Sequence, residues 1–264
     1  MIAILYICTG RYLRFWEGFY TSMEAHFLPD TEKHYYVFTD SETLQVGEDS
    51  PRVHRIHQED LGWPGNTLYR FRMFLRVEED LKNYDYIFYF NANYVCLKDI
   101  SEEEFLPEKD QLLVTLHPGF FQLRPAWFAY DRNHRSTAYV SYYSLRSKHY
   151  FCGGLNGGGA QRYLKLIHDL DRQISEDDRR GITAIFHDES HLNRYMLTQE
   201  NYKILSPSFA YPQGKELPFE PKLLLLEKRK IWSLEDRQPD MTGQKRFTKL
   251  RRYLSYPIDY IKRR

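Results

Sequence analysis

The sequence predicts an α/β fold, and three observations support this. Short runs rich in β-branched and aromatic residues alternate along the chain with segments whose apolar residues recur at helical spacing. The chain has 264 residues, of which 42% are hydrophobic, so it can bury a substantial core in one large domain, or in one domain with a tail. Polar motifs follow several of the apolar runs, at the sheet edge where α/β proteins bind ligands.

The first two predicted elements are a strand over residues 2–8 and a helix over residues 15–27. The strand is an unbroken apolar run, as expected of a buried core strand. In the helix, Trp16, Phe19 and Met23 recur at helical spacing, so one face is expected to pack on the sheet.

Four further strands and one helix are predicted before His117. The strands cover residues 35–39, 53–57, 86–90 and 112–116. The helix covers residues 66–81, with arginines interleaved between its inward-facing residues, which are Leu68, Phe71, Leu75 and Val77.

The rest of the chain is expected to begin with an irregular Tyr-rich span that reaches about Tyr150. A cluster of five glycines follows between residues 153 and 159. Helices are predicted over residues 160–174 and 188–197, with Asp188 as the N-cap of the second. The helices are separated by a loop over residues 176–181 and a strand-like run over residues 182–186.

A basic C-terminal tail begins at about Ile231. We therefore expect one continuous domain over residues 1–230 and a tail over residues 231–264. Three interpretations of the tail stay open: a solvated extension, a contact with an anionic membrane surface, or a lid.

Charge and cysteine usage argue against several classes of protein. The net charge is only +1, and no recognised nucleic-acid-binding module is present. The three cysteines, Cys8, Cys96 and Cys152, predict neither a zinc site nor a disulfide framework. No apolar run reaches the ~18 residues of a membrane span, and the first residues do not have the pattern of a signal peptide. A cytoplasmic protein is the resulting expectation.

Three polar motifs stand at the ends of apolar runs. They are Asn91-Ala92-Asn93, His117-Pro118-Gly119-Phe120 and His187-Asp188-Glu189-Ser190. Each motif alone also has a purely structural interpretation. The asparagines suit a turn, the two acids suit the first turn of a helix, and a histidine at a strand end is often structural.

Six sequence blocks together resemble bacterial members of glycosyltransferase family 6. They are residues 7–12, 35–40, 115–120, 136–139, 152–158 and 187–193. The resemblance extends to about Lys228. It implies the GT-A fold, a Rossmann-like mixed sheet flanked by helices. It also implies a cytoplasmic bacterial enzyme, or one peripheral on the inner membrane.

The activity implied by this resemblance is sugar transfer with retention of configuration. Such an enzyme would move N-acetylgalactosamine or galactose from a UDP-sugar, in α-1,3 linkage, to a terminal and fucosylated galactoside. Two alternatives stay open: a transferase specific for galactose, and a non-catalytic carbohydrate-binding protein on a transferase scaffold. Nucleic-acid binding is less well supported, because the net charge is close to zero.

The resemblance also assigns residues to the donor nucleotide. They are Ile7, Thr9 and Tyr12 for uracil, and Arg70, Asn91, Asn93 and Lys228 for the ribose and diphosphate. The two asparagines stand where the animal relatives have aspartates that bind manganese. Because amide oxygens are weak ligands for hard cations, we expect an enzyme that needs neither a divalent metal nor another cofactor. The alternative interpretation of Arg70 is that it lies on a solvated helix face and does not contact the donor.

Glu189 is the expected catalytic residue, as a nucleophile or as a stabiliser of an oxocarbenium-like transition state. The donor sugar is assigned to Asp188, Cys152, Gly153 and Gly154, and a glycine at position 154 favours the bulkier N-acetylgalactosamine. The acceptor is assigned to His117, Phe186 and Glu189. A buried core position is the alternative for Phe186.

Overall fold

The computed structural model describes residues 1–142, 144 and 148–228. The chain divides into two compact units, Met1–Leu226 and Glu227–Arg264. The basic tail expected from Ile231 onward lies outside the described residues. Among the described residues, no helix combines the length and the apolar character needed to cross a bilayer.

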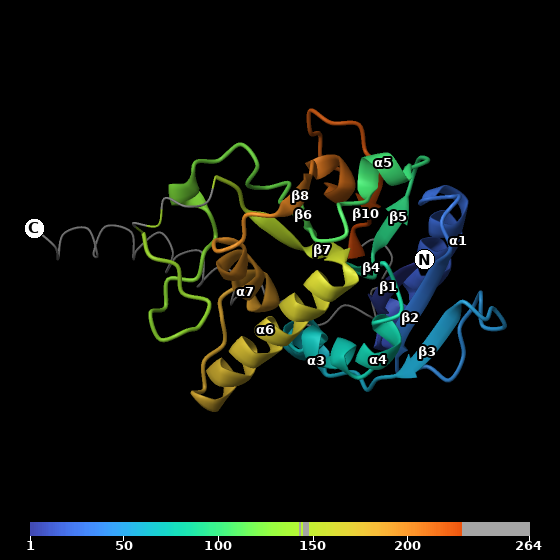
Figure 1. The fold of residues 1–264 in the computed structure, drawn as a ribbon, viewed down its shortest axis with the longest axis horizontal. Helices are drawn as coiled ribbons and strands as arrows, with labels where there is room; N and C mark the ends of the chain where they lie inside the picture. Colours follow the sequence, from blue (N-terminus) through green and yellow to red (C-terminus); the bar gives the residue numbers. More distant parts are fainter. Residues whose placement is uncertain (143, 145–147, 229–264) are drawn as a thin grey trace, which may run out of the picture. The chain divides into compact units, whose positions relative to one another are not determined.

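A seven-stranded mixed sheet forms the centre of the first unit and confirms the expected α/β fold (Figure 1). The strand order is β3-β2-β1-β4-β7-β6-β8. The bounds are β1 Ile2–Ile7, β2 Lys33–Thr39, β3 Val53–His57, β4 Tyr86–Phe90, β6 Leu112–Leu116, β7 Phe151–Gly159 and β8 Tyr202–Leu205. Strands β1 to β4 pair in parallel, β7 is antiparallel to both of its neighbours, and β8 is parallel to β6.

A smaller sheet and several helices complete the first unit. The small sheet has the order β5-β10-β9, with bounds Tyr94–Cys96, Leu223–Leu225 and Tyr211–Pro212. The α-helices are α1 Trp16–His26, α2 Gly62–Leu68, α3 Arg70–Leu75, α4 Glu78–Leu81, α5 Glu102–Phe105, α6 Ala160–Arg179 and α7 His187–Met196. Three short 3-10 helices cover Gly10–Phe15, Pro125–Trp127 and Pro207–Ala210.

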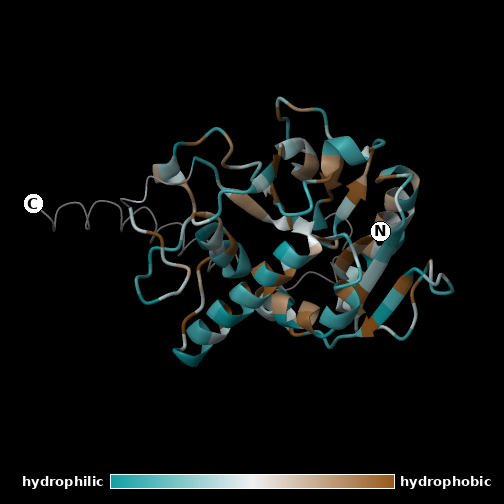
Figure 2. Cartoon of the chain, in the orientation of Figure 1, coloured by the Kyte–Doolittle hydropathy of each residue, from teal (hydrophilic) through white to brown (hydrophobic). Residues whose placement is uncertain are grey.

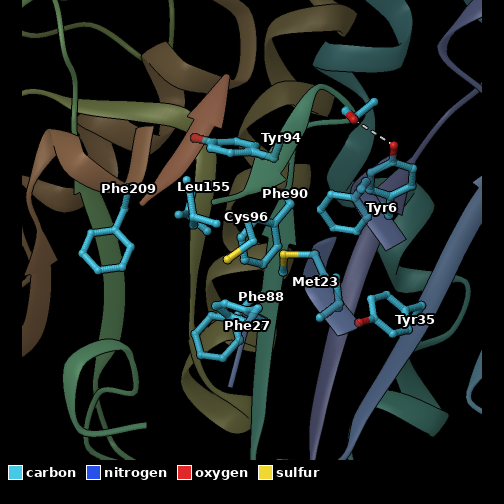
Figure 3. Close-up of a cluster of buried hydrophobic side chains, with 14 of the residues drawn as sticks. Tyr6, Met23, Phe27, Tyr35, Phe88, Phe90, Tyr94, Cys96, Leu155 and Phe209 are labelled. Atoms are coloured by element: carbon cyan, nitrogen blue, oxygen red, sulfur yellow. Dashed lines mark hydrogen bonds between the residues drawn. The ribbon is translucent and has the colours of Figure 1, made fainter. Parts of the chain in front are cut away.

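The main sheet buries apolar side chains on both faces. Alternate residues of β1 enter two separate clusters, as the twofold period of a strand requires. Helices α1 and α5 cover the cluster that contains Tyr6 and Phe88, which Figure 3 shows together with the hydrogen bond of 2.8 Å from the Tyr6 hydroxyl to the Ala92 carbonyl. Helices α3, α6 and α7 cover the other cluster.

Helix α6 is amphipathic along its whole length. Its buried residues include Tyr163, Ile167, Leu170 and Ile174, which lie on one face at helical spacing. Most of its visible surface in Figure 2 is hydrophilic. The packing of α6 on the sheet therefore follows from its sequence pattern.

Strand β7 was not expected from the sequence. Its nine residues include all five glycines of the cluster, and glycine is depleted in strands. Close packing explains their presence, because a Cβ at Gly157 would overlap the Ile87 carbonyl oxygen and the Phe88 ring on β4. The absence of side chains at Gly157 and Gly158 lets β7 fit between β4 and β6.

Four other expectations need correction. The prediction of a single helix over residues 66–81 is wrong. Three helices, α2, α3 and α4, cover this region, and the backbone between them is not helical at Tyr69 and Val77. The loop over residues 176–181 is wrong, because α6 continues to Arg179. Residues 182–186 form no strand, and Ile185 is exposed. Strand β1 ends at Ile7 rather than Cys8.

Candidate active site

The expected site residues meet where β4 ends and β7 begins. Because β7 is antiparallel to β4, the start of β7 lies beside the residues that follow β4. The Asn91 N–H donates to the Gly154 carbonyl at 2.8 Å and continues this pairing beyond the strand. The edge of the sheet where β4 ends therefore brings together Asn91 with Cys152, Gly153 and Gly154.

Helix α7 begins directly beside β7. The Asn193 side chain joins the two elements, since its Oδ1 accepts from the Phe151 N–H at 2.9 Å and its Nδ2 donates to the Phe151 carbonyl at 2.8 Å. The chain enters α7 through His187, whose φ of 52° is unfavourable for a residue other than glycine. The segment just before α7 is fixed by Asp131, whose buried carboxylate accepts from the Ile185 N–H at 2.8 Å.

Asp188 is not the N-cap of α7, as the sequence had suggested. The N-cap is Phe186, and Asp188 lies inside the first turn with its carboxylate turned toward Arg70. The two side chains form an ion pair of 2.8 Å, and both residues are almost fully buried, at 2% and 3% exposed. Burial raises the pKa of Asp188 to about 7, while Arg70 opposes that rise and favours the ionised form.

Arg70 lies in the interior, so its alternative as a solvated helix face is wrong. Besides Asp188, its guanidinium donates to the Gly153 carbonyl at 2.9 Å and to the Thr67 carbonyl at 3.1 Å. It also lies 4.3 Å from the centroid of the Tyr89 ring. In this structure Arg70 thus connects α3 with β7 and α7.

Both oxygens of the Glu189 carboxylate accept hydrogen bonds. Oε2 accepts from the Gly153 N–H at 2.7 Å, and Oε1 accepts from the Tyr150 hydroxyl at 3.1 Å. A Cβ at Gly153 would lie 3.0 Å from Asp188 Oδ2 and 3.2 Å from Glu189 Cβ, so only a glycine fits well here. Burial raises the pKa of Glu189, and these two donors together with Arg70 limit the rise.

The two asparagines have different environments. The Asn91 side chain is partly accessible, and its Oδ1 accepts from the Tyr89 hydroxyl at 2.7 Å. Asn93 is buried, and its Nδ2 donates to the Leu226 carbonyl at 2.7 Å. The Asn93 Oδ1 is buried and has no hydrogen-bond partner among the described residues. Neutral amide oxygens are weaker ligands than carboxylates for a hard divalent cation. In the described part of the chain, no group of three or more His, Cys, Asp or Glu side chains is placed to hold one.

The expected uracil-contacting segment follows β1 at the same edge of the sheet. Ile7 and Thr9 are buried, and Tyr12 is partly buried. Gly10 has a φ of 54°, and its N–H donates to Asp40 at 2.8 Å. Burial raises the pKa of Tyr12, so its hydroxyl stays protonated.

His117 and Phe186 are the two other expected acceptor residues. His117 packs 5.8 Å from Tyr150, ring centre to ring centre. Burial lowers the pKa of His117 to about 4. Phe186 is 37% exposed, so a buried core position is wrong for it.

The sequence did not single out several residues that shape this site. Tyr150 holds Glu189, Asn193 joins α7 to β7, and Trp63, which is 59% exposed, packs its ring 4.9 Å from that of His187. Asn193 is four residues after Glu189 and so shares its helix face, which is a signal that could have been used. Lys228 belongs to the second unit.

Comparison with known proteins gives a consistent result. A model of glycosyltransferase family 6 matches residues 1–231. The chain is 34% identical over 233 residues to the O-antigen biosynthesis glycosyltransferase WbnI of Escherichia coli, and this match covers 88% of the chain and 97% of the relative. It is 30% identical over 220 residues to the histo-blood group ABO system transferase 1 of Rattus norvegicus, covering 80% of the chain and 61% of the relative.

A third relative is the globoside alpha-1,3-N-acetylgalactosaminyltransferase 1 of Homo sapiens, with 26% identity over 230 residues, covering 84% of the chain and 64% of the relative. The chain therefore spans less than two thirds of these two animal relatives. Fold and matches together define the protein as a glycosyltransferase with the expected GT-A-type architecture.

The chain belongs to glycosyltransferase family 6, as its sequence blocks had indicated. Membership of this family implies a hexosyltransferase that uses a nucleotide-sugar donor and a glycan acceptor.

Proposed function

We propose that this glycosyltransferase moves N-acetylgalactosamine from UDP to the 3-hydroxyl of a terminal galactoside with retention of configuration. The observation that carries the proposal is the position of Glu189, whose carboxylate is held by two hydrogen bonds beside the Asp188–Arg70 pair. An ionised group in such a buried setting is well suited to stabilise positive charge at the anomeric carbon.

The net bond changes are the same for both roles that Glu189 can take, although a double displacement also forms a bond between Glu189 and the anomeric carbon that the acceptor oxygen then breaks. The bond between the anomeric carbon and the phosphate oxygen breaks, and UDP leaves with the electron pair. The acceptor oxygen becomes bonded to the same face of the sugar, and its proton passes to the phosphate oxygen of the departing UDP. Glu189 acts either as the nucleophile of a double displacement or as the anion that stabilises an oxocarbenium-like transition state.

Product analysis tests the proposed reaction. Purified enzyme is incubated with UDP-GalNAc and 2′-fucosyllactose, and the product is characterised by NMR. We expect N-acetylgalactosamine in α linkage to position 3 of the galactose. A β-linked product would rule out retention. Absence of both transfer and UDP-sugar hydrolysis across a panel of galactosides would instead favour a carbohydrate-binding protein on a transferase scaffold.

Gly154 is the proposed determinant of donor choice. A Cβ at this position would lie 2.9 Å from Asn91 Nδ2 and 3.6 Å from the Tyr94 ring, so a larger residue would have to displace the Asn91 side chain within the site. We expect wild-type enzyme to prefer UDP-GalNAc, and Gly154→Ala to shift the ratio of kcat/KM toward UDP-Gal by roughly tenfold. Initial rates with the two donors measure this ratio.

Gly153→Ala provides the matched comparison for Gly154→Ala. Its added methyl group meets Asp188 and Glu189, so we expect it to slow both donors alike and to leave their ratio unchanged. A wild-type enzyme that turns over UDP-Gal faster would favour the galactose-specific alternative. An unchanged ratio in Gly154→Ala would remove the steric explanation.

We further propose that transfer needs no divalent metal. Asn91 and Asn93 offer neutral amides in place of carboxylates, and we expect the partly accessible Asn91 to contact the ribose or diphosphate. Arg70 is the proposed first cation, and its ion pair with Asp188 at 2.8 Å offsets part of its charge at the site. A second cation is proposed from Lys228. Transfer that survives chelation of divalent ions is the expected result.

For the acceptor, we propose a hydrogen bond from His117. The pKa of about 4 makes its ring neutral at pH 7, and Nδ1 accepts from the Gly119 N–H at 3.0 Å. The ring proton is therefore on Nε2, which can donate to a sugar hydroxyl. Phe186, partly exposed at the start of α7, is the proposed apolar surface for the acceptor ring.

A further inference from the structure

Tyr150 is fully buried at the point where the long Tyr-rich span enters β7. Its hydroxyl lies 3.1 Å from Glu189 Oε1 and 3.4 Å from the Ala129 carbonyl oxygen. The phenol carries one proton, and the shorter contact to a charged acceptor is the stronger of the two. When Glu189 is ionised, the Tyr150 proton is therefore directed at its carboxylate.

The ring of Tyr150 belongs to an aromatic cluster that includes His117. The Phe120 and Phe128 rings lie 4.8 Å and 5.8 Å from it, and that of Tyr130 lies 5.6 Å away. Its backbone carbonyl accepts from the His117 N–H at 2.9 Å. One residue thus touches both His117, proposed to bind the acceptor, and Glu189, proposed to act on the donor sugar.

We propose that Tyr150 is a positioning residue of the transfer reaction, which keeps the Glu189 carboxylate oriented and ionised through a hydrogen bond from its hydroxyl. The inference rests on the proposed catalytic role of Glu189. The Gly153 N–H fixes Oε2, and two donors on different oxygens fix the plane of the carboxylate. Burial disfavours the ionised form of Glu189, so loss of one donor has a direct effect on its protonation.

The primary test is Tyr150→Phe, which removes the hydroxyl and keeps the ring. We expect kcat to fall about tenfold, because a hydrogen bond to a charged group is lost. The pKa of Glu189 should rise, so the acidic limb of the pH–rate profile should move to higher pH by roughly one unit. The KM for the acceptor should change less than about twofold, because the aromatic packing is retained.

Tyr130→Phe is the matched control. It removes a hydroxyl from the neighbouring ring of the same cluster, and that hydroxyl donates to the His149 carbonyl at 3.4 Å. Its pH profile should coincide with that of wild-type enzyme. A Tyr150→Phe profile that also coincides with wild type would overturn the proposal, as would an equal shift in both variants.

A second substitution keeps the test valid if Tyr150→Phe folds poorly. Site-specific incorporation of 3-fluorotyrosine at position 150 preserves size and makes the hydroxyl a stronger donor. The acidic limb should then move to lower pH, and a shift to higher pH or no shift would contradict the proposal. Failure of this inference is distinct from failure of the proposed function, because the latter is decided by the activity of Glu189→Gln and the anomeric form of the product.

Discussion

Replacing Glu189 by glutamine is expected to lower the rate of sugar transfer by at least about a thousandfold. The amide has the size of the carboxylate and can still accept hydrogen bonds at its oxygen, but it carries no charge. It therefore can neither attack the anomeric carbon nor stabilise positive charge there. Initial rates of transfer from UDP-GalNAc at saturating donor measure the effect, and a thermal unfolding curve confirms that the variant is folded.

Glu200→Gln is a suitable control for this variant. Glu200 is exposed after the end of α7, so its neutralisation should leave the rate within about twofold of wild type. If Glu189→Gln keeps more than a tenth of wild-type activity while folding normally, Glu189 does not act on the reacting atoms.

Arg70→Met is expected to have the largest effect on stability. It leaves Asp188 buried without its ion-pair partner, and breaking such a pair costs about 3–5 kcal/mol. It also removes donors from the Gly153 and Thr67 carbonyls. Chemical denaturation at pH 7 measures the loss of free energy of unfolding.

The pH dependence of this loss of stability shows how much of it arises from the buried charge of Asp188. The pKa of Asp188 is about 7 in the folded protein, compared with its usual value of 3.8, so the folded state binds more protons between these values. This carboxyl therefore destabilises the fold progressively as pH rises through that window. Without Arg70 the pKa of Asp188 rises further, so the pH range over which its ionisation destabilises the folded state extends upward. The difference in stability between wild type and Arg70→Met should thus widen from pH 5 to pH 8.

Two variants control for other effects of Arg70→Met. Arg72→Met removes an arginine two residues away, whose ion pair with Asp171 at 3.3 Å is partly exposed, and should cost no more than about 1 kcal/mol. Addition of Asp188→Asn to Arg70→Met should recover part of the stability at pH 8, because the unpaired charge is gone. A constant difference between wild type and Arg70→Met from pH 5 to pH 8 would show that charge burial is not the cause.

Most of the sheet follows from the sequence, and its least predictable strand is the one that builds the site. The runs at β1, β2 and β4 are apolar enough to be recognised locally. Strand β7 is not, because Gly157 and Gly158 are required by the close approach of β4 and β6 rather than favoured by strand propensity. The division of residues 66–81 into three helices is likewise set by packing, since the apolar period alone continues across Tyr69 and Val77.

The site shows a similar division between local and long-range information. The residue types and their order along the chain are enough to identify the carboxylates, the asparagines and the glycines as candidate site residues. The partners of these residues depend on tertiary structure, because Arg70 and Asp188 are far apart in sequence and their ion pair could not be inferred from local spacing. The same holds for Tyr150 and Glu189. An N-cap was predicted for Asp188 because the local signal favours it, but its ion pair with Arg70 requires a different position in the helix.

The most direct test of the central claim is transfer from UDP-GalNAc to 2′-fucosyllactose by purified enzyme in excess EDTA. The claim is that neutral amides and fixed protein cations take the place of a bound metal at the diphosphate. It predicts that the rate in EDTA equals the untreated rate and that added Mn²⁺ changes it less than about twofold. Loss of transfer in EDTA, followed by recovery on addition of Mn²⁺, would contradict it.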